Sequence, residues 1–121
     1  MELQIKSDTS IIDLQKQFNS FYPFLQIQFL RNEQPEEKSV QKMKKVQPDA
    51  LLKQLIRFYE PFKLTVSNET TVAQLLKDFK KVGLIAQLNR RSGNLWIEIC
   101  LTDDWTLKHQ NEEAGLITLS S

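Results

Sequence analysis

The sequence predicts one α+β domain, in which two tandem copies of a β-α-β-β-α unit form a mainly antiparallel sheet with helices on one face. Three observations lead to this fold class. Short segments alternate apolar and polar residues, as strands with one buried face do. Longer segments carry apolar residues at helical spacing and are preceded by residues that typically cap the start of a helix. The same order of segments occurs twice, which divides the single domain 1–121 into a first repeat unit, 1–61, and a second, 62–121.

Length and composition agree with a folded domain of this kind. The 121 residues fit one domain and can bury a core without disulfides or metal. Apolar residues make up 40% of the chain and charged residues 26%, and the seven Phe and two Trp argue against disorder. The formal net charge is +1, and acidic and basic residues balance in each half. Neither half therefore favours nucleic acid or a membrane surface as a partner.

The cysteine content and the N-terminal segment indicate a cytoplasmic protein. Cys100 is the single cysteine, so no intramolecular disulfide can form, which suits a reducing compartment. The first residues, MELQIKSDTS, lack the pattern of a signal peptide, although the mature form of an exported protein would look similar. No apolar run approaches the ~20 residues that span a bilayer, so we expect no membrane contact.

The repeat is visible when residues 3–21 are compared with residues 64–82, which lie 61 positions later. Apolar positions coincide, and Phe18 falls on Phe79. The alternative is that two generic strand–helix units share a periodicity by coincidence. The match continues into the following segments, however, which favours a structural duplication.

The offset of the repeat becomes smaller along the chain. It is 59 from Leu25 onward and 55 in the last part, where Val46 falls on Leu101. Each change of offset lies at a predicted loop, where proteins tolerate differences in length.

Each unit begins with a strand and a helix. Leu3 and Ile5 alternate with polar residues, and Leu64 and Val66 repeat this pattern. Capping-box patterns, Ser10-x-x-Asp13 and Thr71-x-x-Gln74, then start the helices. The helices carry matching apolar stripes at Ile11, Leu14, Phe18 and Phe21, and at Val72, Leu75, Phe79 and Val82.

A strand hairpin follows each helix. Pro23 and Gly83 end the helices, and strands are predicted over 25–31 and 84–90. Gly93 suits the positive φ of a tight hairpin turn. The returning strand of the second unit places Leu95, Ile97, Ile99 and Leu101 toward the core. The matching segment 39–46 forms either a strand or a helical turn.

A last helix closes each unit. In the first unit it begins at Pro48 and runs through an apolar stretch to Phe58. In the second it spans 102–114 and ends at Gly115, and residues 116–119 add a short strand. We predict a core of Leu3, Ile5, Leu14, Phe18, Ile27, Phe29, Leu55, Leu64, Val66, Leu75, Phe79, Leu88, Ile97 and Ile99.

Catalytic signatures are absent from the sequence. It contains no P-loop, no dinucleotide-binding glycine run and no G-x-S-x-G elbow. His109, the single histidine, lies in a polar stretch and reads as a surface residue. One histidine and one cysteine are too few for a zinc site in a monomer, and nothing local activates Cys100. We therefore expect no catalytic residue, no metal and no cofactor.

Two charged groups have functional interpretations that we rank below structural ones. Asp103 and Asp104, with Glu98, could hold Mg²⁺ or act as acids and bases, but capping of the following helix explains them better. Basic residues occur at Lys42, Lys44 and Lys45, at Lys77, Lys80 and Lys81, and at Arg90 and Arg91. Because acidic residues dilute these basic spots, we expect solvated surfaces and no nucleic-acid partner.

The second face of the sheet carries the candidate site. A strand with Leu95 and Ile97 on the core side must place Trp96 on the other. We expect this face to gather Gln4, Lys6, Gln26, Gln28, Lys63, Thr65, Gln87, Asn89, Trp96, Glu98 and Cys100. A large aromatic on such a face suits a contact with a partner, although the face could also be simply hydrated. The candidate binding residues are Trp96, Arg90, Arg91, Gln28, Gln87 and Glu98.

Two resemblances accompany these patterns. The segment RRSGNLWIEICLTDDWTL, residues 90–107, resembles a stretch of small bacterial proteins of unknown function, and it carries no motif of known chemistry. The predicted topology resembles the strand–helix–strand–strand modules of bacterial effector-binding domains. That resemblance implies the binding of small molecules or proteins, as an analogy of fold alone.

The leading hypothesis is a non-enzymatic protein-interaction module whose partner is another protein or a second copy of the chain. A small-molecule-binding domain is the alternative, with its ligand between the two units or over the Trp96 sheet face. An enzyme that uses Asp103, Asp104 or His109 ranks third.

Overall fold

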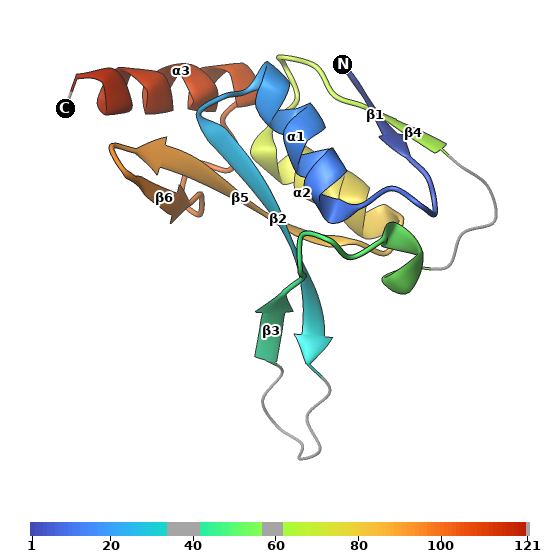
Figure 1. The fold of residues 1–121 in the computed structure, drawn as a ribbon. Coiled ribbons are helices and arrows are strands. Elements are labelled where there is room, and N and C mark those ends of the chain that lie inside the picture. Colours follow the sequence, from blue (N-terminus) through green and yellow to red (C-terminus); the bar gives the residue numbers. More distant parts are fainter. Residues whose placement is uncertain (34–41, 57–61, 121) are drawn as a thin grey trace.

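The computed structural model describes residues 1–33, 42–56 and 62–120 of the chain (Figure 1). The predicted α+β class is confirmed, because helices and mainly antiparallel strands share one chain. In chain order the elements are β1 (Glu2–Ile5), α1 (Ile11–Phe21), β2 (Leu25–Glu33), β3 (Lys42–Lys45), the 3-10 turn η1 (Leu52–Gln54), β4 (Phe62–Thr65), α2 (Val72–Lys81), β5 (Ile85–Ser92), β6 (Leu95–Glu98) and α3 (Leu107–Leu119).

The strands form two sheets, where the sequence predicted one. β1 pairs with β4 in a two-stranded antiparallel sheet, and the other strands form a four-stranded antiparallel sheet in the order β3-β2-β5-β6. Gln4 and Lys63, expected on the same face as Trp96, pair with each other in the small sheet. The polar face that contains Trp96 therefore has fewer residues than predicted, and all of them belong to the large sheet.

Helices α1 and α2 lie side by side between the two sheets, and α3 crosses one end of the large sheet (Figure 1). α1 contacts both β1 and β2, α2 contacts β5, and α3 contacts β5 and β2. Alternation along β2 directs Leu25, Ile27 and Phe29 toward the helices, where all three are buried. The opposite face of the large sheet is the one that bears the polar residues of β2 and β5.

Most of the predicted core is buried, with one clear error. Phe18 and Phe79, at matching positions of α1 and α2, are both 0% exposed. Leu55 and Leu64 are partly buried at the edge of the core. Ile97, predicted to be buried, is 43% exposed. It lies on β6, an edge strand whose main contact is with β5, so alternation alone did not bury it.

The other residues that were predicted to face the core from this strand also differ in burial. Leu95 is exposed, Ile99 is buried, and Leu101 lies in a turn after β6 with 95% of its side chain exposed. Strand alternation assigns a side chain to a face, but only the packing of another element on that face removes it from water.

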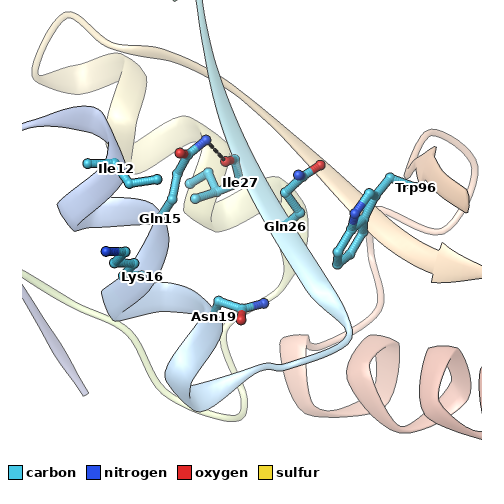
Figure 2. A pocket seen from close by; sticks show the side chains of 7 residues that line it. All are labelled: Ile12, Gln15, Lys16, Asn19, Gln26, Ile27 and Trp96. Atoms are coloured by element: carbon cyan, nitrogen blue, oxygen red, sulfur yellow. Dashed lines mark hydrogen bonds between the residues drawn. The ribbon is translucent and has the colours of Figure 1, made fainter. Parts of the chain in front are cut away.

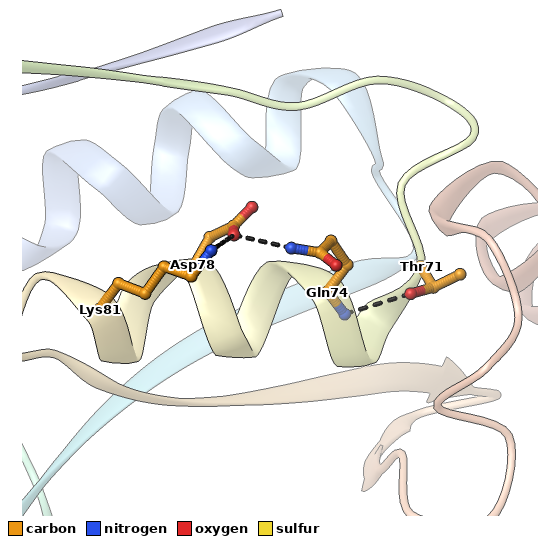
Figure 3. A network of polar contacts seen from close by, with 4 residues as sticks. All are labelled: Thr71, Gln74, Asp78 and Lys81. Carbon is orange, nitrogen blue, oxygen red and sulfur yellow. Dashed lines mark hydrogen bonds and ion pairs between the residues drawn. The ribbon is translucent and has the colours of Figure 1, made fainter.

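Helix starts follow the predicted N-caps. The Ser10 hydroxyl accepts a hydrogen bond from the backbone N–H of Asp13, and Thr71 does the same for Gln74. In a full capping box the Gln74 side chain would also bond back to the backbone of Thr71, but here it makes a different contact. The Gln74 side chain donates to Asp78, which also faces Lys81 at 3.7 Å (Figure 3).

The last helices differ from the prediction in both units. In the first unit the chain forms only the short turn η1 over 52–54, and the predicted end at Phe58 lies outside the described residues. In the second unit α3 continues through Gly115 to Leu119, so the predicted strand over 116–119 is wrong. Gly115 packs against Phe24, where an added Cβ would lie 3.0 Å from the ring. This glycine permits close packing and does not end the helix.

Matching hydrogen bonds occur in the two halves. The N–H of Val46 donates to Phe29, and the N–H of Ile99 donates to Leu88. Val46 thus corresponds to Ile99, where the sequence comparison had matched it to Leu101. The segment 39–46 is resolved as a strand from Lys42 onward, and its earlier residues lie outside the described part of the chain.

The start of each central helix is held in the same way. Ile11 donates to the carbonyl of Ala50, and Val72 donates to that of Trp105. These pairs lie at the offsets of 61 and 55 that the sequence comparison used. The two halves therefore share their order of elements up to the last helix, whereas duplication of an ancestral unit stays a prediction.

Candidate functional site

The polar face of the large sheet brings together five of the six candidate binding residues. Trp96 on β6 pairs with Arg91 on β5, and Glu98 pairs with Asn89. Gln28 on β2 pairs with Gln87 on β5. Because side chains alternate along each strand, these residues share the face opposite α1 and α2. We call the set of Trp96, Arg91, Glu98, Asn89, Gln87, Gln26 and Gln28 the Trp96 face.

Arg90 is the candidate that the structure separates from the others. It pairs with Leu25 on one side and Ile97 on the other, and the side chains of both lie on the face of the sheet opposite Trp96. Its neighbour Arg91, the other candidate arginine, lies beside Trp96. Side chains alternate between the two faces of a strand, so the consecutive residues Arg90 and Arg91 lie on opposite faces of the sheet.

A network of side-chain amides occupies the centre of the Trp96 face. Asn89 is 5% exposed, and its Nδ2 donates to Oε1 of Gln26 at 2.9 Å and of Gln28 at 3.2 Å. Its Oδ1 accepts from Gln87 Nε2 at 2.9 Å. The buried Asn89 amide is thus satisfied on both its nitrogen and its oxygen, as a buried polar group must be. The network fixes the orientation of the three glutamines around it.

The Trp96 side chain is half-buried and held by its neighbour on β5. The Arg91 guanidinium lies 5.3 Å from the centre of the Trp96 ring, within the range of a cation–π contact. Arg91 Nε also donates to the carbonyl of Gly93 at 2.7 Å, which ties the guanidinium to the hairpin turn. Gly93 has the positive φ of 62° that was predicted for this turn. The hairpin therefore helps to hold the indole in place.

Trp96 also forms one wall of a pocket of about 270 Å³ (Figure 2). The other lining residues come from α1 and from β2, and they are Ile12, Gln15, Lys16, Asn19, Gln26 and Ile27. The pocket follows the outer side of β2, with α1 along one side and the indole along the other (Figure 2). We call it the Trp96 pocket.

Two side chains of α1 reach the backbone of β2 inside this pocket. Gln15 Nε2 donates to the carbonyl of Ile27 at 2.9 Å, and Asn19 Nδ2 donates to the carbonyl of Leu25 at 3.1 Å. The sequence analysis missed all four α1 residues of the pocket. A signal was present, because the repeat breaks there: Gln15 and Asn19 correspond to Leu76 and Lys80 in the second unit.

The other candidate groups show no arrangement suited to catalysis. His109 is exposed, and its ring stacks edge-on against Trp105 with centroids 4.4 Å apart. Glu98, Asp103 and Asp104 are exposed, and within the described residues no group of three or more His, Cys, Asp or Glu could hold a metal ion. Cys100 is a free, exposed thiol. In the described ranges no helix has the length and apolar character needed to cross a membrane.

Comparisons with protein-family models, with curated proteins and with solved structures gave no match.

Proposed function

We propose that the protein is a non-enzymatic interaction module that binds another protein, or a second copy of itself, through the Trp96 face. The observation that supports this proposal best is the half-buried Trp96 held by Arg91 on the sheet face that α1 and α2 leave open. Aromatic anchors of this kind contribute much of the energy of protein interfaces, especially when their position is fixed in the free protein.

The surroundings of Trp96 suit a protein partner. The amides of Gln26, Gln28 and Gln87 offer donors and acceptors beyond those used by Asn89, and these free groups can pair with the backbone of a partner. Glu98 and Arg91 add charges of both signs, which favours a mixed protein surface over a polyanion. We place this module in the cytoplasm, a reducing compartment in which the exposed Cys100 thiol persists.

The test compares the wild type with Trp96→Ala and with a control, Phe21→Ala, which removes another exposed aromatic side chain at the end of α1. We expect Trp96→Ala to weaken association at least tenfold, in line with the loss of an interface anchor, without change in the far-ultraviolet circular dichroism. Sedimentation measures self-association, and tagged protein measures capture of a foreign partner. Equal association and capture by wild type and Trp96→Ala would refute the proposal.

The second candidate function is the binding of a small molecule in the Trp96 pocket. Its volume of about 270 Å³ and its mixture of an indole, two isoleucines and several amides favour a small, flat ligand with polar edges. Native mass spectrometry of the purified protein tests this function. A bound small molecule that is retained by the wild type and lost from Trp96→Ala would favour this candidate over the first.

A further inference from the structure

We propose that the outer edge of β2, from Leu25 to Ile27, receives an extended peptide of a partner protein as an added strand, with an acidic residue of the peptide beside Lys16. This inference rests on the proposed function and names the kind of partner. It concerns the backbone edge of β2 inside the Trp96 pocket, whereas the proposed function concerns the Trp96 side chain.

Among the described residues, no strand pairs with the outer side of β2 from Leu25 to Gln28. The N–H of Leu25 donates to the carbonyl of Tyr22, and the carbonyl of Phe29 accepts from the N–H of Val46. β3 pairs with β2 only over Leu30–Glu33, and β5 pairs with the inner side from Leu25 onward. The N–H of Ile99 donates to Leu88, so the polar groups of Leu88 point away from β2. Because Leu88 faces Ile27 in an antiparallel pair, the N–H and C=O of Ile27 point away from β5 as well. The backbone of Ile27 is therefore presented at the free edge.

Two side-chain amides of α1 already donate to the carbonyls of β2 that an added strand would use. Gln15 and Asn19 donate to the carbonyls of Ile27 and Leu25, two residues apart along β2. This is the spacing at which an added strand would present its own donors. Asn19 is exposed and Gln15 is partly exposed, so both can leave the edge for water. Such side chains protect a free edge from unspecific pairing and give way to a specific strand.

The walls of the pocket indicate which peptide would fit. A strand alternates its side chains, so one set would face Ile12 and Lys16 on α1 and the other would face Trp96 and Gln26. Lys16 is the single charged residue among the seven that line the pocket, and among the described residues it has no ion-pair partner. An acidic peptide side chain would provide that partner.

The matching edge of the second half lacks these features. The positions of Gln15 and Asn19 are taken there by Leu76 and Lys80, and that of Gln26 by Ile85. Leu76 packs against the core, and neither residue carries an amide. The inference is therefore specific to the edge of β2.

The experiment uses the full chain and two synthetic heptapeptides with capped ends, one alternating valine with glutamate and the other valine with lysine. We expect the glutamate peptide to shift the backbone N–H signal of Ile27 and the indole N–H signal of Trp96 in ¹H–¹⁵N spectra. A version of this peptide with N-methyl groups along its pairing edge should bind at least tenfold more weakly, because it cannot form the strand hydrogen bonds.

Variants separate the contributions of the edge and of the charge. Gln15→Ala with Asn19→Ala removes the competing donors, and we expect this pair to strengthen binding of the glutamate peptide roughly 2- to 10-fold. Lys16→Glu should weaken it by a similar factor and favour the lysine peptide. Lys77→Glu, at the matching exposed position of α2, is the control and should change neither affinity.

The result separates this inference from the proposed function. Shifts at Trp96 without shifts at Ile27, together with equal binding of the N-methylated peptide, would overturn strand addition and leave Trp96 as an interface residue. The absence of any shift at Leu25–Ile27 with either peptide at millimolar concentration would also overturn it.

Discussion

Gln28 and Gln87 face each other as a directly paired couple in the middle of the β2–β5 contact. The pairs on either side, Ile27 with Leu88 and Phe29 with Ala86, exchange places when the two halves are interchanged at the offset of 59. A pseudo-two-fold axis between the halves would pass at this couple. The two sides of the axis carry different chemistry, because Asn89 on one side corresponds to Leu30 on the other.

The matched core positions predict equal losses of stability. Phe18 and Phe79 are both fully buried, at equivalent places on α1 and α2. We expect Phe18→Ala and Phe79→Ala each to lower the free energy of unfolding by about 3–5 kcal/mol, measured by urea denaturation. Phe21→Ala, at an exposed position, should change it little. A loss below about 1 kcal/mol for either buried position would contradict this view of the core.

The N-caps predict a smaller pair of effects. Ser10 and Thr71 each accept a hydrogen bond from a backbone N–H in the first turn of α1 and α2. Ser10→Ala and Thr71→Ala should each cost about 0.5–2 kcal/mol, because the N–H loses its partner. Ser20→Ala, in the last turn of α1, provides a comparison outside the cap. Thermal unfolding of the variants measures both costs, and unchanged midpoints would show that the caps contribute nothing.

Loss of the Asn89 side chain should lower the stability of the protein at the candidate site. Its amide makes three hydrogen bonds in a position that is 5% exposed. Asn89→Ala should lower the free energy of unfolding by about 1–3 kcal/mol, because the surrounding glutamines lose their shared partner. Amide signals of Gln26, Gln28 and Gln87 should also broaden in ¹H–¹⁵N spectra. Sharp, unmoved signals would show that the network does not fix these side chains.

Tyr22 predicts a dependence of stability on alkaline pH. Burial, and to a lesser extent the charge of Glu69, raises the pKa of the Tyr22 phenol above its usual value of 10.0. Above pH 10.0 the unfolded chain loses this proton before the folded protein does, so the free energy of unfolding falls as the pH rises. Well below that pH the phenol is protonated in both states and contributes no slope to the pH dependence.

The matched variant for this prediction is Tyr22→Phe. It removes the hydrogen bond from the phenol to Asn68 and should lower stability at neutral pH. Its further decline between about pH 9 and about pH 11 should be shallower than that of the wild type, because the titrating phenol is gone. Parallel curves from urea denaturation would show that Tyr22 titrates alike in both states.

His109 predicts an absence of effect on binding. Its ring is exposed and stacks on Trp105, and His109 is not among the residues that line the Trp96 pocket. His109→Ala should retain fold and partner binding, and the lost ring contact should cost no more than about 1.5 kcal/mol. A variant that folds normally but loses its activity would overturn the non-enzymatic proposal.

Local patterns determined much of this protein. Alternation in Leu3 and Ile5, helical stripes through Phe18 and Phe79, and the caps at Ser10 and Thr71 are set by neighbours along the chain. These features could be predicted because each depends on a short segment and on its own periodicity. The side of β6 on which Trp96 lies was predicted for the same reason.

The tertiary structure decided what covers each face and what meets at each edge. Ile97 has the correct alternation for the core but stays exposed, because β6 is an edge strand that packs mainly on β5. Gly115 lies inside α3, where its lack of a Cβ leaves room for the ring of Phe24. Gln15 and Asn19 lie at the edge of β2 through the docking of α1, a contact that no local period encodes. Contacts between elements depend on how the elements pack, so the sequence determined the elements and their polar faces, and packing created the Trp96 pocket.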